Sequence, residues 1–115
     1  MTLARQLPVI GADSIPVGKI LAVGRNYADH AAEMQAPADP VIFMKPTTAL
    51  RLPGEDVVLP RDRGSVHHEV EILVALSRGG TRLTEAEAAR AVGAYGIGLD
   101  LTLRDVQAAA KAKGL

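Results

Sequence analysis

The stretch "HHEVEILVAL", His67 to Leu76, decides how the fold is read. Polar and apolar residues alternate at its start and the rest is apolar, a pattern that predicts a strand entering a hydrophobic core. Side chains two residues apart lie on the same face of a strand, so Glu69 and Glu71 are predicted to stand side by side, about 6.5–7 Å apart. Two carboxylates buried together repel each other and lose hydration, so this pair needs a physical explanation.

Two explanations fit the paired glutamates. An edge strand with one wet face would leave both carboxylates solvated. Apolar residues on both faces after Glu71 favour instead a central strand, whose carboxylates need a counter-charge. A divalent cation such as Mg²⁺, Mn²⁺ or Ca²⁺ supplies that charge through hard oxygen ligands. Asp100, the one carboxylate in the apolar stretch "GIGLDLT", is the natural third ligand, and its other explanation is a cap for the following helix.

The remaining secondary structure follows from apolar runs and their flanking residues. Short apolar runs between glycines or prolines predict further strands at 18–24, 40–46, 57–59 and 94–101. Helices are predicted at 27–35, 83–93 and 102–115. The pattern is that of an α+β domain with several short strands and three modest helices.

Capping residues mark where the helices begin and end. Asn26 is predicted to cap the first helix, and Thr84 with Glu87 forms a capping box for the second, which Gly93 ends. Thr102 is predicted to cap the third helix, and Gly114 to end it in a Schellman motif.

Composition narrows the class of protein. The 115 residues carry 13 basic and 13 acidic side chains, so no basic field suggests nucleic acid or a membrane surface. Three aromatic residues are few for a nucleic-acid stacking platform. The lack of cysteine excludes disulfides and zinc–thiolate sites. No run resembles a signal peptide or a membrane span, so we expect a single cytoplasmic domain.

Charged residues elsewhere have both a catalytic and an ordinary explanation. His30 and Glu33 lie three apart on the predicted first helix, within reach of each other. A glutamate that orients a histidine raises its basicity, as the activation of water requires, whereas the ordinary explanation is a solvated helix face. Lys45 and Arg104 each suit a carboxylate substrate and equally suit the surface.

Five segments together resemble a known family. They are "KILAVGRNYADHAAEM", "PVIFMKP", "HHEVEILVAL", "GAYGIGLDLTLRDVQ" and "AKAKGL". In this order and spacing, from Lys19 to Leu115, the chain resembles the fumarylacetoacetate hydrolase family, specifically its small, single-domain acylpyruvase-like members. The resemblance implies a β-rich α+β fold, part of a mixed β-sandwich roll, in a homodimer.

The same resemblance implies a domain organisation. Family chains continue past the position of Leu115 with further strands, an active-site lysine and a Gly/Thr-rich loop. We therefore expect residues 18–115 to be the N-terminal half of the catalytic domain, truncated, after an N-terminal extension at 1–17. Because a rolled sandwich needs the other half to close, we expect residues 1–115 alone to associate, to bind Mg²⁺ weakly and to show no acylpyruvase turnover.

The resemblance also assigns roles to site residues. It implies that Glu69, Glu71 and Asp100 hold Mg²⁺ or Mn²⁺, and that the catalytic pair on a mobile lid helix is His30 and Glu33. Contacts to the substrate carboxylate are implied for Arg25, Lys45, Arg104 and Gln107.

The chemistry implied by these residues starts from a small 2-oxo or 1,3-diketo acid that chelates the cation. Chelation polarises the 2-oxo carbonyl and stabilises the enolate that departs when a C–C bond breaks. Hydrolysis of an acylpyruvate such as acetylpyruvate or fumarylpyruvate to pyruvate and a carboxylic acid is the expected reaction. The alternatives are oxaloacetate decarboxylation, isomerisation of a hydroxymuconate-type diacid, and a non-catalytic metal-binding remnant.

Overall fold

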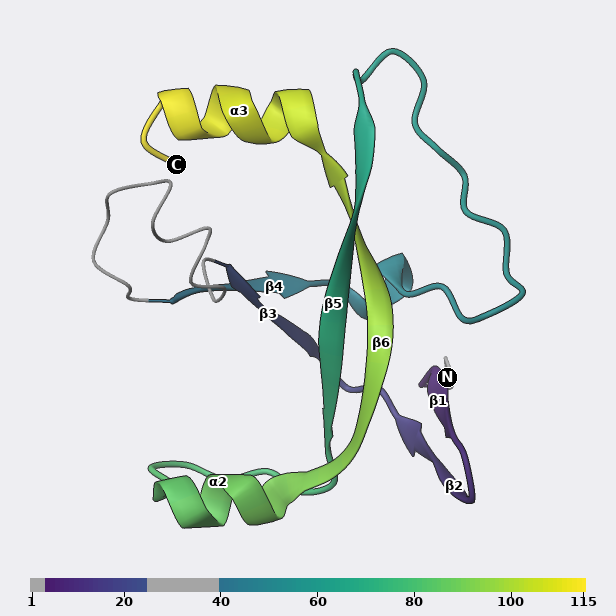
Figure 1. Ribbon diagram of the computed structural model, residues 1–115, viewed down its shortest axis with the longest axis vertical. Coiled ribbons are helices and arrows are strands. Elements are labelled where there is room, and N and C mark those ends of the chain that lie inside the picture. The colour runs from purple at the N-terminus through teal and green to yellow at the C-terminus, as the bar shows by residue number, and fades with distance from the viewer. Residues whose placement is uncertain (1–3, 25–39) are drawn as a thin grey trace. The chain divides into compact units, whose positions relative to one another are not determined.

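Antiparallel strand pairs make up most of the regular structure, which a computed structural model describes for residues 4–24 and 40–115 (Figure 1). The chain divides into two compact units, residues 1–55 and 56–115. In the described residues each sheet has two strands. The β-rich α+β class predicted from the sequence is confirmed.

The first unit contains two antiparallel strand pairs. Strand β3 (Ile20–Gly24) pairs with β4 (Val41–Lys45), and both were predicted. Strands β1 (Gln6–Val9) and β2 (Ala12–Pro16) pair around Gly11, whose φ of +74° suits a tight turn. This hairpin was not predicted, because each of its strands contains a proline, which argues against a strand except at an edge. The first unit ends in a short 3₁₀ helix, η1 (Thr47–Ala49), and the loop that follows it.

The predicted strand at 57–59 is wrong. Residues 55–60 have no regular structure, and the side chain of Val58 is 87% exposed. The apolar run is too short to compete with its neighbours, since Pro53 and Gly54 form a turn before it and Pro60 lacks a backbone donor after it.

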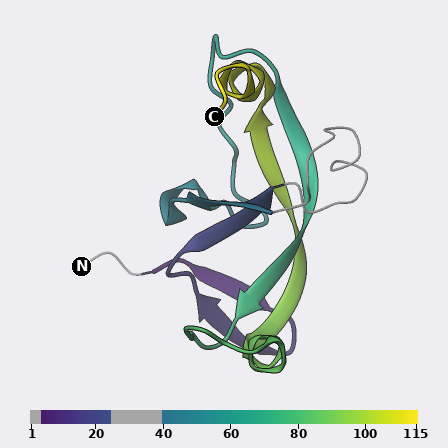
Figure 2. The same cartoon turned by 90° about the vertical axis from the view of Figure 1, so that its left-hand side faces the viewer.

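The second unit is built on one long hairpin. Strand β5 (Val66–Leu76) pairs with β6 (Val92–Leu103) along its whole length, with an irregularity at Ala75 and Leu76. Helix α2 (Glu85–Ala91) joins the two strands, and helix α3 (Arg104–Ala112) follows β6. The hairpin is a twisted ribbon with α2 at one end and α3 at the other (Figures 1 and 2).

Two of the predicted helix signals are confirmed. Thr84 and Glu87 form the reciprocal capping box at the start of α2. At the end of α3, Gly114 has a φ of +77° and donates its N–H to the carbonyl of Lys111 at 3.0 Å. The N–H of Leu115 reaches the carbonyl of Ala110 at 3.0 Å, which completes the Schellman motif.

Two other helix signals are wrong. Thr102 does not cap α3, because it lies in β6 opposite His67 and its hydroxyl donates to the carbonyl of Asp100 at 3.3 Å. Gly93 does not end α2, which stops at Ala91. In both places the ladder between β5 and β6 continues further than the local pattern indicates, and its hydrogen bonds displace the predicted helix boundary.

The long hairpin has two chemically different faces. The carboxylate face carries Glu69 and Glu71 of β5 and, across the ladder, Asp100 of β6. The other face, here called the apolar face, carries the side chains of Val70, Ile72, Val74, Tyr95, Ile97 and Leu99. All six are exposed, and Ala91 is the only buried residue in the described part of the chain. The hairpin therefore removes little apolar surface from water, the main source of folding free energy.

In the described residues, no helix is both long enough and apolar enough to cross a lipid bilayer.

The capping box makes the start of α2 sensitive to acid. The backbone N–H and the hydroxyl of Thr84 both donate to the Glu87 carboxylate, at 2.8 and 2.9 Å, and they hold its pKa below the usual value of 4.5. A carboxyl group with a lowered folded pKa stabilises the fold above its unfolded pKa, and the contribution is lost as the pH falls through the folded value. We expect Glu87 to titrate below pH 4.5 in an NMR titration, and the α2 amides to lose exchange protection through the same range. The variant Glu87→Gln keeps an oxygen acceptor at every pH and should show no such step; a wild-type midpoint at or above 4.5 would contradict the assignment.

The apolar face predicts association. At micromolar concentrations the 115-residue protein should elute above its monomer mass in light-scattering chromatography, because exposed apolar strands bury their surface against one another. A charge at the centre of the face, Ile97→Glu, should shift the protein toward monomer. The matched control is Val58→Glu, a change at an equally exposed position outside the strands, which should leave association unchanged. Elution of the wild type as a monomer would contradict the prediction that the apolar face drives association.

Candidate metal-binding site

The register of the long hairpin determines which carboxylates share a face. Glu69 lies directly opposite Asp100, and Glu71 lies opposite Gly98. Directly opposed side chains project from the same side of a sheet, with Cβ atoms about 4.5–5.5 Å apart. Glu71 is two residues from Glu69 along β5, about 6.5–7 Å away. Three carboxylates, from two strands, therefore stand on one small area of the carboxylate face.

The side chains of this face do not converge on a point. In residues 4–24 and 40–115, no three histidine, cysteine, aspartate or glutamate side chains come close enough together to hold a metal ion. Glu69 is instead in an ion pair, with its Oε1 2.8 Å from Nη2 of Arg104. The backbone thus assembles a candidate donor set, while the side chain of Glu69 is oriented by an arginine.

Arg104 reaches Glu69 because the start of α3 is fastened to the start of β5. The backbone N–H of Arg104 donates to the carbonyl of Ser65 at 3.0 Å, and the N–H of Ser65 donates to the Asp105 carboxylate at 3.1 Å. Gly64, with a φ of +77°, lets the chain pass this carboxylate; a Cβ there would collide with it. These contacts hold the guanidinium beside the carboxylate face.

The guanidinium of Arg104 uses only part of its hydrogen-bonding capacity. Its Nη2 binds Glu69, but its Nε is buried and has no hydrogen-bond partner among the described residues. A bidentate arginine–carboxylate pair would use two parallel N–H groups and be correspondingly stronger. The contact between Arg104 and Glu69 is therefore a single hydrogen-bonded ion pair, with both side chains part-buried.

The other predicted substrate contacts are spread over the two units. Gln107 lies three residues after Arg104 on α3, hence on the same side of that helix, and is half-buried. Lys45 ends β4 in the first unit. The predicted residues Arg25, His30 and Glu33 lie outside the described residues.

The contact between Arg104 and Glu69 was not predicted from the sequence. The pattern indicated that the glutamates need a counter-charge, and a divalent cation was the source considered. Pairing "HHEVE" against "LDLTLR" in the register that opposes Glu69 and Asp100 would have placed Leu103 opposite Val66, and so Arg104 beside the start of this strand. That signal points to Arg104 as a second source of positive charge.

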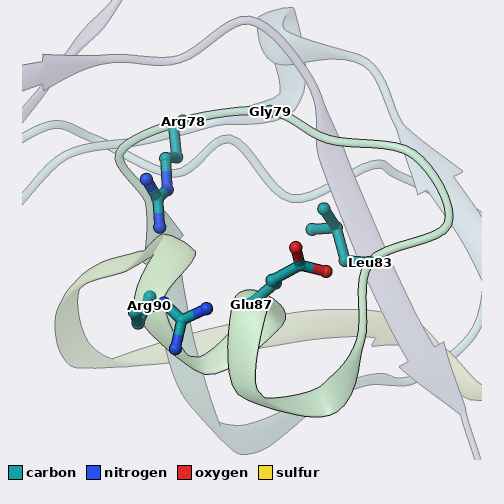
Figure 3. Close-up of a pocket in the computed structure, with 5 residues that line it drawn as sticks. All are labelled: Arg78, Gly79, Leu83, Glu87 and Arg90. Carbon is teal, nitrogen blue, oxygen red and sulfur yellow. The ribbon is translucent and has the colours of Figure 1, made fainter.

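A pocket lies at the other end of the hairpin, away from the carboxylate face. Its volume is about 320 Å³, and it lies between α2 and the loop after β5 (Figure 3). Its lining comprises Arg78, Gly79, Leu83, Glu87 and Arg90. None of the residues predicted for the site lines it, and Glu87 is already engaged in the capping box. The candidate chemistry is therefore assigned to the carboxylate face and not to this pocket.

Comparison with known proteins identifies relatives of several activities. Residues 19–115 match the family model of the fumarylacetoacetate (FAA) hydrolase C-terminal domain. The oxaloacetate tautomerase YcgM of Escherichia coli is 46% identical over 101 residues, which are 86% of this chain and 46% of that protein. The chain thus spans about half the length of the curated relatives that it matches.

Solved structures give the same result. Fumarylpyruvate hydrolase from Pseudomonas aeruginosa, solved in complex with Mn²⁺ and pyruvate, superposes with a TM-score of 0.83 at 34% identity, covering 99% of this chain and 52% of that one. A 5-carboxymethyl-2-hydroxymuconate delta-isomerase from Mycobacterium smegmatis superposes with a TM-score of 0.70 at 41% identity, covering 89% and 39%. The motifs, the hairpin and these relatives agree, and the chain belongs to the fumarylacetoacetate hydrolase family, whose members are hydrolases, isomerases and tautomerases.

Proposed function

We propose that the carboxylate face binds Mg²⁺ or Mn²⁺ through Glu69, Glu71 and Asp100, as part of a homodimeric enzyme that acts on small 2-oxo acids. The observation that carries the proposal is the β5–β6 register, which opposes Glu69 to Asp100 and leaves Glu71 on the same face. Carboxylate oxygens are the ligands that these hard cations prefer. The complex of a relative with Mn²⁺ and pyruvate supports both the metal and the class of ligand.

The donor set fits a divalent cation in charge and reach. Three carboxylates provide oxygen ligands of negative charge, and one of them, Glu69, is also paired with Arg104. Cβ atoms about 5–7 Å apart allow aspartate and glutamate side chains to turn toward a shared ion at about 2.0–2.6 Å from each oxygen. Such an ion supplies electrophilic stabilisation of the enolate of a 2-oxo acid.

The reaction we propose first is hydrolytic C–C cleavage of an acylpyruvate. His30, oriented by Glu33, takes a proton from water, which attacks the carbonyl distal to the carboxylate. The C–C bond then breaks, a carboxylic acid leaves, and the pyruvate enolate is protonated at carbon. Arg25, Lys45, Arg104 and Gln107 would hold the carboxylate of the substrate.

Oxaloacetate tautomerisation is the second candidate, and the E. coli relative at 46% identity favours it. This reaction moves one proton between C3 and the 2-oxo oxygen and needs no attacking water. It uses the same stabilised enolate, so the carboxylate face serves both reactions, and the isomerase relative fits the same scheme.

Loss of one carboxylate tests the metal site. Binding of Mn²⁺ to the 115-residue protein, followed by the EPR signal of the free ion, should weaken at least about tenfold in Glu69→Gln and in Asp100→Asn, because each removes an anionic oxygen ligand. Glu85→Gln, which removes an acid from α2, should bind Mn²⁺ like the wild type. So should His30→Ala, since His30 is assigned to the proton and not to the ion. Equal affinities across all five proteins would remove the basis of the proposal.

The product then separates the candidate reactions. Acetylpyruvate and oxaloacetate are supplied side by side with and without Mg²⁺. Pyruvate with acetate identifies the hydrolase, loss of the enol absorbance of oxaloacetate without pyruvate identifies the tautomerase, and CO₂ release identifies a decarboxylase. Metal binding without any product is the outcome expected both of residues 1–115 alone and of the non-catalytic alternative.

A further inference from the structure

Arg104 binds Glu69, the carboxylate that the register places between the other two acids. Glu69 is adjacent to Glu71 along β5 and opposite Asp100 across the ladder. Its Oε1 is bound by Nη2 of Arg104 at 2.8 Å. Of the three acids, the one best placed to join the others is therefore the one that an arginine holds.

Two observations together indicate competition. The backbone brings three carboxylates onto one face, yet no three such side chains converge in the described part of the chain. The ion pair accounts for the orientation of Glu69, because a carboxylate oxygen directed at a guanidinium is not directed at a point shared with its neighbours. A guanidinium and a divalent cation are alternative counter-charges for one oxygen atom.

The ion pair is weak enough to be displaced. The two side chains retain 36% and 28% of their exposure, so water screens their attraction. Only one nitrogen contacts the carboxylate, and the buried Nε has no partner among the described residues. Arg104 therefore gives up one part-buried hydrogen bond when Glu69 turns away.

We propose that Arg104 is a positioning residue that holds Glu69 in the metal-free protein and must release it before a divalent cation can be bound. The inference rests on the proposed metal site and adds the step that controls its occupancy. Because the backbone of Arg104 stays fastened to Ser65, the released guanidinium remains beside the face, within reach of the carboxylate of a 2-oxo acid.

The first measurement is Mn²⁺ affinity by EPR on the 115-residue protein. Arg104→Gln should bind Mn²⁺ about three- to tenfold more tightly than the wild type, because a competing cation and its repulsion are removed. Arg104→Lys keeps a positive charge and should stay near the wild type. The difference should shrink in about 1 M salt, where the Debye length falls to about 3 Å.

The chain offers a matched control in its other unit. Arg5 and Glu55 form an ion pair of the same length, 2.8 Å, with side-chain exposures of 34% and 37%. Arg5→Gln removes one positive charge of the same kind, and so changes the net charge of the protein equally. It should leave Mn²⁺ affinity unchanged, which separates local competition from a general charge effect.

The second measurement needs no metal. Denaturation midpoints of Arg104→Gln, Glu69→Gln and the double variant in EDTA should be non-additive, because each single change breaks the same contact. Additive shifts would mean that the pair is not formed and would overturn the inference whatever the metal does. This cycle also detects a variant that fails to fold.

The outcomes distinguish this inference from the proposed function. If Glu69→Gln loses Mn²⁺ affinity while Arg104→Gln gains none, the metal site stands and the role of Arg104 is wrong. If neither the wild type nor Arg104→Gln binds Mn²⁺, the metal site itself is wrong and the inference falls with it. Binding by Arg104→Gln alone would be the strongest support for competition.

Discussion

The antiparallel pairing of β5 with β6 is the constraint on which the rest of the second unit depends. Side chains alternate between faces along a strand, so a slip of one residue would carry Asp100 to the apolar face and bring Leu99 or Leu101 opposite Glu69. The register is held at one end by the connection through α2, and at the other by the bonds of Ser65 to Arg104 and Asp105. The register of the strand pair therefore also determines which residues form the candidate site.

The same pairing leaves the apolar face exposed in the part of the chain that the structure describes. A two-stranded ribbon is marginal in water unless another layer packs on it, because its own ladder buries little apolar surface. Val70, Ile72 and Ile97 are all more than half exposed. The charged face opposite needs access to solvent and ligands. One hairpin therefore presents a surface suited to packing and a surface suited to chemistry.

Sequence reasoning succeeded where a signal is local and failed where it depends on the partner strand. The alternation around Glu69 and Glu71, the capping box of Thr84 and the Gly114 motif each need only neighbouring residues, and the structure contains all three features. Thr102 was misplaced because a ladder partner extends β6 beyond its local pattern. The first hairpin was missed because its prolines oppose strand formation on average, although an edge strand tolerates them. The Arg104 contact depends on the rotamer of a long side chain, which periodicity does not encode.

In the proposed scheme, the counter-charge that the sequence pattern calls for comes from two sources, Arg104 without a bound ion and a divalent cation when one is bound. Three like charges on one face oppose folding, since opposed acids in a ladder repel each other. Arg104 relieves part of that repulsion with a residue of the chain itself, so formation of the hairpin does not have to wait for an ion. The same relief lowers the net gain when an ion is bound, because the contact to Glu69 must first be broken. A face that depended on metal alone would hold the ion more tightly but fold less readily without it. In this scheme a part-buried, single-contact arginine pair is the intermediate solution: strong enough to offset part of the repulsion and weak enough to be replaced.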